Sequence, residues 1–402
     1  MVSAPVRYTL ALIGFLLVGY IGWSAYVYIF DTTVPEVTVV GIEDGDWYVG
    51  DVPCVIAMRD QAKVADLSLF LDSKPLVSHF KIGKVAAEHT CIIPTTSLPY
   101  GKHELRIVVS DSSYRKNTTE CRIQFFVDNI PLQAAFIRPD VDIKVFQGRT
   151  LHLMFQASKR IKSAVAKCLN REHICVPEDG DSTIYEAFIP IACEERATEY
   201  PLSIEITDAV GTMVTLDTKF QVVAFPFPKQ TLKLDPEAIA REKASWPNQQ
   251  EFENKISELT KRSPHKKLWR GSFYMPTEVH RISTAFGTVR ATQHRGRYMH
   301  QAVDLVGEPK RVVWAPQDGV IVLQERYAAS GNTVVIDHGC GILSLFFHLD
   351  SCAELPVGSV VHQGNPIGTI GKTGFADGYH VHWELRIDNI AVDPLQWIKD
   401  EF

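Results

Sequence analysis

The chain has 402 residues, of which 46% are hydrophobic and 22% charged, and this balance excludes a disordered or collagen-like protein. Lysine and arginine number 41 against 47 aspartates and glutamates, so the net charge is -6 and the chain lacks the basic field that nucleic acid requires. Eight cysteines are too few for a small disulfide scaffold and contain no Cys-x-x-Cys pair. We expect several folded domains, cysteines that pack inside them with at most one or two bridges, and no nucleic acid partner.

An uncharged span lies near the N-terminus. Residues 8–30 contain no charged side chain, and as a helix this span would measure about 35 Å, enough to cross a bilayer core of about 30 Å. Arg7 precedes the span, Asp31 follows it, and aromatic residues gather at its far end. A cleaved signal peptide is the alternative, but the span is too long for one and ends without a good cleavage site. We expect a single-pass anchor, with the following residues outside the cytoplasm.

Residues 31–128 and 129–225 have the pattern of two copies of one unit. Asp31 and a nearby proline are echoed by Asp128 and Pro131 about 97 residues later, and alternating runs end at Asp111 and Asp208. Such alternation predicts strands with one buried face. A repeat of about 100 residues built this way resembles an immunoglobulin-like sandwich. Because neither copy has a cluster of His, Asp or Glu that resembles a site, we expect spacers or binding arms.

The composition changes in residues 226–267. Asp235 and Pro236 have the residue types that begin a helix, and a second helical piece places Phe252 and Ile256 on one apolar stripe. We expect a short helical connector whose charged residues form a solvated face.

The C-terminal region carries the candidate chemistry. His380 and His382 stand in an alternating run, and side chains two apart on a strand point to one face, so the two rings can share a site. His300 and Asp304 are four apart in a segment that we expect to turn into a strand, and alone this spacing is a weak metal signal. His348 lies in an apolar strand, where a single histidine is usually a core residue.

Taken together, these segments form an ordered series of motifs. The series comprises Ser283-Thr-Ala-Phe-Gly287, His300-x-x-x-Asp304, Ala315-Pro-Gln-Asp-Gly319, Gly331-Asn-Thr-Val-Val-Ile-Asp-His-Gly339, Phe347-His348-Leu349, Val357-Gly358, Gly364-Asn-Pro-Ile-Gly368, Gly371-Lys-Thr-Gly374 and His380-Val-His382-Trp-Glu384. On these motifs residues 272–398 resemble the lysostaphin/LytM-type zinc endopeptidases, which cut peptide bridges in bacterial peptidoglycan. The resemblance implies a small, mostly antiparallel β domain of the duplicated hybrid motif fold, with a cleft across its sheet.

The resemblance also implies roles for five residues. His300, Asp304 and His382 would bind zinc (Zn²⁺), and His348 and His380 would line the same cleft as catalytic histidines. Zinc held by two imidazoles and one carboxylate keeps an open position, where it lowers the pKa of water and polarises a substrate carbonyl. All five positions carry the residue that this chemistry requires.

Aromatic residues near these motifs are candidates for the substrate groove. We expect Tyr327, Phe375 and Trp383 to line it, with aromatic core packing as the alternative reading. Asp337 and His338 lie in a hairpin beside the site, and for them a turn-stabilising role is favoured over catalysis.

The sequence thus predicts a membrane-anchored, zinc-dependent endopeptidase that acts on peptidoglycan peptide stems and hydrolyses their cross-links. It would be held in a bacterial cytoplasmic membrane with its catalytic domain on the periplasmic or extracellular side. Two alternatives stay open: a non-catalytic cell-wall-binding or amidase-activating module, and a zinc peptidase acting on a protein. A regulatory protein partner is also open. The expected mostly β architecture is a transmembrane helix (8–30), two immunoglobulin-like modules (31–128 and 129–225), a helical connector (226–267) and an antiparallel β metallopeptidase domain (268–402).

Overall fold

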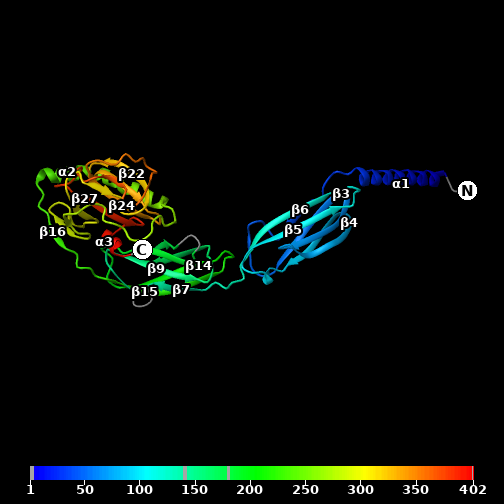
Figure 1. Cartoon of the computed structure of the whole chain (residues 1–402), viewed down its shortest axis with the longest axis horizontal. Helices are drawn as coiled ribbons and strands as arrows, with labels where there is room; N and C mark the ends of the chain where they lie inside the picture. Colours follow the sequence, from blue (N-terminus) through cyan, green and yellow to red (C-terminus); the bar gives the residue numbers. More distant parts are fainter. Residues whose placement is uncertain (1–3, 139–142, 179–181, 401) are drawn as a thin grey trace. The chain divides into compact units, whose positions relative to one another are not determined.

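The computed structural model describes residues 4–138, 143–178, 182–400 and 402, and most of its elements are β-strands (Figure 1). The chain divides into two compact units. The first contains Met1–Pro131 with Ala209–Gly211, and the second contains Leu132–Asp208 and Thr212–Phe402.

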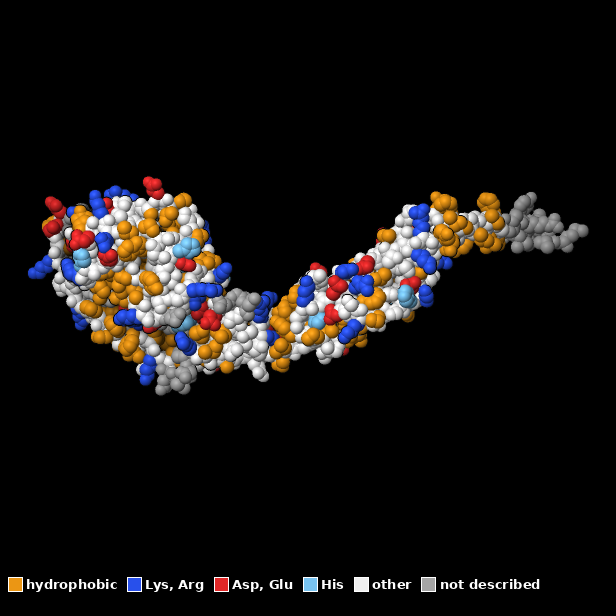
Figure 2. Space-filling model, viewed as in Figure 1, with side chains coloured by type: hydrophobic (Ala, Val, Ile, Leu, Met, Phe, Trp, Pro, Cys, Tyr) orange, Lys and Arg blue, Asp and Glu red, His pale blue; other side chains and the backbone are white. Residues whose placement is uncertain are grey.

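A long apolar helix opens the first unit. α1 spans Ala4–Phe30, and its stretch Leu12–Phe30 is the one helix in the described residues that is long and apolar enough to cross a membrane. The large side chains of this stretch are exposed, with Phe15 at 77%, and hydrophobic side chains gather on the part of the helix that Figure 2 does not draw in grey. The helix therefore presents apolar side chains on its surface rather than packing them into a core.

Six strands form the first β module. β3 and β4 are long partners, paired from Val52 opposite Ile93 to Leu71 opposite Lys74. β1 pairs with the first half of β3, β5 with its second half, β6 with β5, and β2 runs parallel to β6. The bounds are β1 Glu36–Val40, β2 Trp47–Tyr48, β3 Val52–Leu71, β4 Lys74–Ile93, β5 Gly101–Asp111 and β6 Thr118–Val127, with a 3-10 helix at Thr95–Ser97.

The second β module has two sheets, ordered β11-β10-β14-β15-β8 and β12-β13-β9-β7. Leu153, Phe155 and Ile204 are fully buried in the core of this module. The bounds are β7 Ala134–Arg138, β8 Lys144–Phe146, β9 Thr150–Ala157, β10 Ser163–Cys168, β11 Arg171–Ile174, β12 Val176–Pro177, β13 Ile184–Pro190, β14 Glu199–Thr207 and β15 Met213–Val223.

The two modules share one pairing pattern. β9 pairs with β7 and β13, as the first half of β3 pairs with β1 and the second half of β4. β14 pairs with β10 and β15, as β5 pairs with the second half of β3 and with β6. The parallel pair of β8 with β15 repeats that of β2 with β6. The difference is that β3 and β4 run unbroken where the second module has separate strands.

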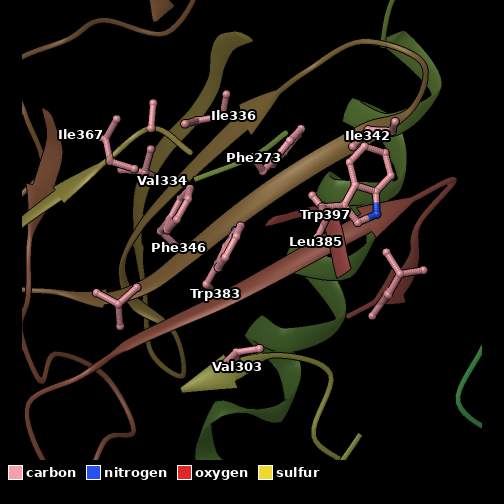
Figure 3. Close-up of a cluster of buried hydrophobic side chains, with 14 of the residues drawn as sticks. Phe273, Val303, Val334, Ile336, Ile342, Phe346, Ile367, Trp383, Leu385 and Trp397 are labelled. Atoms are coloured by element: carbon pink, nitrogen blue, oxygen red, sulfur yellow. The ribbon is translucent and has the colours of Figure 1, made fainter. Parts of the chain in front are cut away.

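The C-terminal domain is built on a large antiparallel sheet, ordered β17-β20-β27-β24-β23-β22-β25, with β28 on β27. Smaller sheets pair β21 with β26 and β18 with β16 and β19. Phe273, Phe346, Trp383 and Trp397 are buried in its core (Figure 3). The bounds are β16 Lys229–Thr231, β17 Arg281–Thr284, β18 Val289–Thr292, β19 Gly296–Met299, β20 Val303–Val306, β21 Val312–Trp314, β22 Gly319–Tyr327, β23 Gly331–Asp337, β24 Ile342–Leu349, β25 Val360–Val361, β26 Pro366–Thr369, β27 Val381–Ile387, β28 Ile390–Val392 and α3 Pro394–Lys399.

Residues between the second module and the C-terminal domain form one long helix, α2 (Pro236–Arg262), instead of two short pieces. Phe252 and Ile256 are buried against a patch of the C-terminal domain that includes Leu345 and Phe347. The predicted apolar stripe is therefore confirmed.

The charged residues of α2 are not simply a solvated face, and that interpretation is wrong for at least two of them. Glu253 lies 2.6 Å from Arg386 of β27. Glu242 lies 2.7 Å from His294 and 3.4 Å from Arg295, both in the turn after β18. The side chain of His294 is consequently only 8% exposed, although this residue lies in a turn.

The second β module and the C-terminal domain also pack together within the second unit. Phe188 of β13 lies in the same core as Trp397 of α3, with ring centroids 5.7 Å apart. The Trp397 indole N–H donates to Thr150 Oγ1 at 3.0 Å, and Lys267 Nζ lies 2.9 Å from Glu186. This module is therefore an attached support for the C-terminal domain.

Candidate metal centre

Three side chains converge where β20 meets β27. These neighbouring strands are antiparallel, and their register places Asp304 opposite His382. His300 lies three residues before β20 begins. One ligand atom from each of His300, Asp304 and His382 lies within 4.8 Å of the other two. The structure thus brings together all three residues that the sequence assigned to a metal.

The His300 imidazole is buried, and its ring nitrogens lack hydrogen-bond partners among the described residues. Its side chain is 4% exposed, and its Nε2 lies 3.1 Å from Asp304 Oδ1. Neither ring nitrogen has a hydrogen-bond partner in the part of the chain that the structure describes. Burial lowers the pKa of His300. A buried neutral imidazole without hydrogen bonds is costly, and the neutral ring is the form that binds metal ions.

Asp304 is held as a carboxylate by the groups around it. Its Oδ1 accepts a hydrogen bond from His382 Nδ1 at 2.9 Å, and its Oδ2 accepts one from Arg290 Nη2 at 3.1 Å. Burial alone would raise the pKa of Asp304, but the His300 and His382 rings outweigh it and hold this pKa far below its usual range. Sequence reasoning missed Arg290, because a single arginine on an isolated strand carries no motif.

A chain of polar contacts runs along one face of β27. His382 Nε2 lies 3.1 Å from Glu384 Oε1, and Arg386 Nε donates to Glu384 Oε2 at 2.6 Å. Arg386 also donates two hydrogen bonds to Glu253 of α2, at 2.6 and 3.2 Å. Metal-binding imidazoles are commonly oriented by a carboxylate on their second nitrogen. The strand period of two places His382, Glu384 and Arg386 together, and α2 completes the chain.

The polar contacts along β27 determine the protonation state of His382 when no metal is present. Burial would lower the pKa of His382, but hydrogen bonds and charges from Asp304 and Glu384 raise it to about 9. Burial would likewise raise the pKa of Glu384, but Arg386 and His382 lower it to about 2. A metal ion that takes a nitrogen of His382 must therefore displace a proton at neutral pH.

His348 and His380 flank the three converging residues. Their ring centroids lie 4.9 Å apart, and His380 Nε2 lies 3.8 Å from Asp304 Oδ1. Nδ1 of His348 lies 2.8 Å from the Thr373 carbonyl oxygen, and Nδ1 of His380 lies 2.9 Å from that of Gly378. A carbonyl oxygen only accepts, so Nδ1 carries the hydrogen in each contact and Nε2 is left as an acceptor.

His348 is also held in an uncommon backbone conformation. Its φ is 63°, in the left-handed region that non-glycine residues rarely adopt, and its N–H donates to the Ser330 carbonyl at 2.8 Å. Burial, with smaller contributions from His382 and His380, lowers the pKa of His348 to about 3. The ring therefore stays neutral at neutral pH, and its Nε2 can accept a hydrogen bond.

A cleft of about 780 Å³ opens over these residues. Tyr327 and Phe375, which the sequence assigned to a substrate groove, lie in its wall, and α2 supplies part of another wall through Phe252 and Glu253. Tyr327 packs edge-on against Phe252, with ring centroids 4.9 Å apart. The cleft therefore includes the connector as well as the C-terminal domain.

Trp383 does not line the cleft, and its assignment to the groove is wrong. Its side chain is 0% exposed and stacks on Phe346 in the core, with ring centroids 6.2 Å apart (Figure 3). It follows His382 on β27, so the strand pleat directs it to the opposite face of the sheet.

The hairpin residues beside the site have structural contacts. His338 is fully buried, with Nδ1 2.7 Å from the Asp318 carbonyl oxygen and Nε2 2.9 Å from Ser344 Oγ. Asp337 accepts hydrogen bonds from Ser263 Oγ and from the Gly339 N–H. These contacts agree with the turn-stabilising role that the sequence favoured.

Comparison with known proteins places this site in a family. Residues 298–394 match the sequence profile of Peptidase family M23. The chain is 34% identical over 128 residues to the DD-carboxypeptidase/endopeptidase Mpg of Neisseria meningitidis, covering 31% of this chain and 29% of that protein. It is 31% identical over 120 residues to the peptidoglycan DD-endopeptidase ShyC of Vibrio cholerae, covering 30% and 28%.

A third relative has a different activity in its name. The chain is 27% identical over 180 residues to the murein hydrolase activator EnvC of Escherichia coli, covering 40% of this chain and 43% of that protein. The chain thus matches less than half the length of each of these three relatives. Residues 298–394 hold His300, Asp304, His348, His380 and His382, and this part of the C-terminal domain belongs to peptidase family M23.

Proposed function

We propose that this protein is a membrane-anchored, zinc-dependent endopeptidase that hydrolyses peptide cross-links of bacterial peptidoglycan. The observation that carries the proposal is the convergence of His300, Asp304 and His382 within 4.8 Å, flanked by two further histidines at the floor of a cleft. A purely structural domain has no need to bury such a set of ionisable groups.

The donor set fits zinc. Two imidazole nitrogens and one carboxylate oxygen make the three-ligand arrangement of catalytic zinc sites, which keep a fourth position for water or substrate. His300 offers a buried ring with no hydrogen bond, and Asp304 is anionic. When bound, zinc would lower the pKa of water and polarise the scissile carbonyl.

The flanking histidines supply proton transfer. Nε2 of His348 is an acceptor in a ring that stays neutral, so it can take a proton from the attacking water and return it to the amine that leaves. His380 presents Nε2 from the other side and can hydrogen-bond the developing oxyanion when that nitrogen carries the proton. We assign these two tasks jointly to His348 and His380.

The substrate assignment comes from the relatives and from the cleft. Two relatives are named as DD-endopeptidases or carboxypeptidases, one explicitly for peptidoglycan. The cleft is open and has both aromatic and charged walls, which suits an extended peptide with carboxylate and amine groups. We infer that the substrate is a peptide stem or cross-link of the cell wall.

The rest of the chain would bring this domain to the wall. We propose that α1 is a single-pass anchor in the cytoplasmic membrane, with the catalytic domain on the periplasmic or extracellular side. The recurring strand pairing of the two β modules supports immunoglobulin-like sandwiches that act as the stalk. Peptidoglycan is a fixed polymer layer, so an anchored enzyme needs such a reach.

The likeness to EnvC favours a second candidate, a domain that activates another hydrolase without hydrolysis of its own. This reading keeps the fold and the cleft but requires no metal. The intact set of His300, Asp304, His382, His348 and His380 favours the enzyme, because an activator needs neither ligands nor a proton acceptor.

The discriminating experiment is digestion of purified sacculi by the full chain in detergent, followed by mass analysis of the released fragments. We expect cleaved peptide cross-links with zinc, none after chelation, and recovery when zinc is returned. His362→Ala, which alters a histidine whose side chain is 72% exposed, is the matched control and should digest like the wild type. Fragments released only when an amidase is added would support the activator.

A further inference from the structure

Three aspartates gather at the end of α1, outside the M23 domain. Asp31 is the first residue after that helix, Asp60 lies within β3, and Asp111 ends β5. One carboxylate oxygen of each lies within 4.8 Å of the other two. Asp60 is 5% exposed and Asp111 is 1% exposed. The expectation that neither β module holds a clustered acidic site is wrong here.

Neutral donors, rather than cations, reach this cluster in the described residues. Asp60 accepts a hydrogen bond from the backbone N–H of Ala62, and Asp111 accepts hydrogen bonds from Ser113 and Asn117. Oδ1 of Asp31 accepts from Thr33, but its Oδ2 is buried without a hydrogen-bond partner. No Lys, Arg or His of the described residues forms an ion pair with any of the three aspartates. Burial, together with the charges of Asp31 and Asp111, raises the pKa of Asp60. Burying carboxylates together without a cation is unfavourable.

The second module shows how the same position can be neutralised. Asp128 and Asp208 recur there about 97 residues after Asp31 and Asp111. Lys159 Nζ lies 2.8 Å from Asp208 Oδ2, and both side chains are at most 3% exposed. The second module therefore carries its own cation as a buried ammonium group.

Asp60 of the first module lies one residue from the position at which the second module has this lysine. The stretch of β3 that pairs with β1 ends at Arg59, and the stretch of β9 that pairs with β7 ends at Ala157. Asp60 is the first residue after its point and Lys159 is the second after its own, and both are buried polar residues. The first module thus has a buried acid near the position at which the second module has a buried cation.

We propose that the first β module binds one calcium ion between Asp31, Asp60 and Asp111. Calcium takes six to eight oxygen ligands at about 2.3–2.6 Å, so oxygens up to about 5 Å apart can share one ion. Three carboxylates with no nitrogen or sulfur donor favour a hard cation over zinc.

The ion would fasten the membrane helix to the module. Asp31 follows α1 directly, whereas Asp60 and Asp111 belong to the two strands at the centre of the module. The Tyr114 N–H also donates to the Tyr28 carbonyl of α1, at 2.8 Å, beside the cluster. Extracellular calcium modules bind with Kd of about 10⁻⁴–10⁻³ M, and we expect this range.

The test is a calorimetric titration of the full chain in detergent. The protein is first freed of calcium in a buffer that contains zinc, and it is then titrated with calcium chloride and, in parallel, with magnesium chloride. We expect about one calcium per chain, weaker magnesium binding and a rise in the melting temperature of the first unit. Asp60→Asn should weaken calcium binding at least about tenfold. Asp46→Asn, at an exposed aspartate of the same module, is the matched control and should bind like the wild type.

A charge-reversal variant separates calcium binding from folding. Asp60→Lys puts an ammonium group beside Asp31 and Asp111, so this variant should lose the calcium response and melt near the temperature of the calcium-loaded wild type. Absence of calcium binding in the wild type, or wild-type binding by Asp60→Asn, would overturn the proposal. Stronger binding of magnesium than of calcium would overturn the choice of ion.

Discussion

The candidate metal centre (His300, Asp304 and His382) and the aspartate cluster at the end of α1 are both buried groups of ionisable side chains. They differ in the groups that neutralise their carboxylates. Asp304 has two histidines and Arg290 around it, whereas Asp60 has only other acids and a backbone N–H. Nitrogen donors beside a single carboxylate suit zinc, and carboxylates alone suit a hard cation. The comparison teaches that the partners of a buried acid, more than the acid itself, indicate which ion it can hold.

The largest effect should come from removing a nitrogen ligand of the candidate metal centre. His300→Ala and His382→Ala should each lose both bound zinc and sacculus hydrolysis, because two ligands hold the ion poorly. Elemental analysis of the purified full chain measures the metal, with His362→Ala as control. Full zinc content in both variants would contradict the ligand assignment.

Replacement of a flanking histidine should separate metal binding from catalysis. His348→Ala should keep about one zinc per chain and lose roughly 10²–10⁴ in rate, the range for a general acid or base. The zinc content and the hydrolysis rate of one preparation give the answer. Loss of zinc from this variant would mean that His348 is a ligand.

The second module allows a buried carboxylate to be deprived of its cation, because Lys159 and Asp208 form a buried ion pair. Lys159→Met leaves Asp208 buried without its ammonium partner and should destabilise the second unit by about 3–5 kcal/mol. Adding Asp208→Asn to this variant should restore part of the loss, since the orphaned charge is then gone. Urea unfolding of the full chain in detergent measures both, and equal stability of the single variant and the wild type would show that the pair is not needed.

Acid should destabilise the C-terminal domain through His338. Burial lowers the pKa of His338 from 6.5 to about 4. Between these values the unfolded state binds a proton that the folded state does not, so stability falls as pH decreases from 6.5 to 4, by about 3 kcal/mol. Urea unfolding at pH 7.5 and 4.5 should show a smaller loss for His338→Gln than for the wild type, and an identical loss would contradict this reading.

The sequence predicted which side chains converge at the candidate metal centre because its motifs are local. His380 and His382 lie two apart on one strand, and only the antiparallel register of β20 with β27 was needed to bring Asp304 beside them. The groove was harder to predict, because alternation does not say which face of a strand carries the site, and Trp383 was assigned to the wrong face.

Contacts between distant elements lay beyond sequence patterns. The contact of Glu253 with Arg386 joins residues 133 positions apart, and nothing in the helical pattern distinguishes this glutamate from a solvated one. Asp31, Asp60 and Asp111 lie on separate elements for the same reason, so only the strand pairing reveals their cluster.

The most direct test of the central claim is a zinc titration of hydrolysis. The metal-free full chain would be incubated with purified sacculi, and the rate of cross-link release measured as zinc is added. We predict no release without zinc, a linear rise and a plateau at about one zinc per chain. Release that is unchanged by removal and return of zinc would contradict the account.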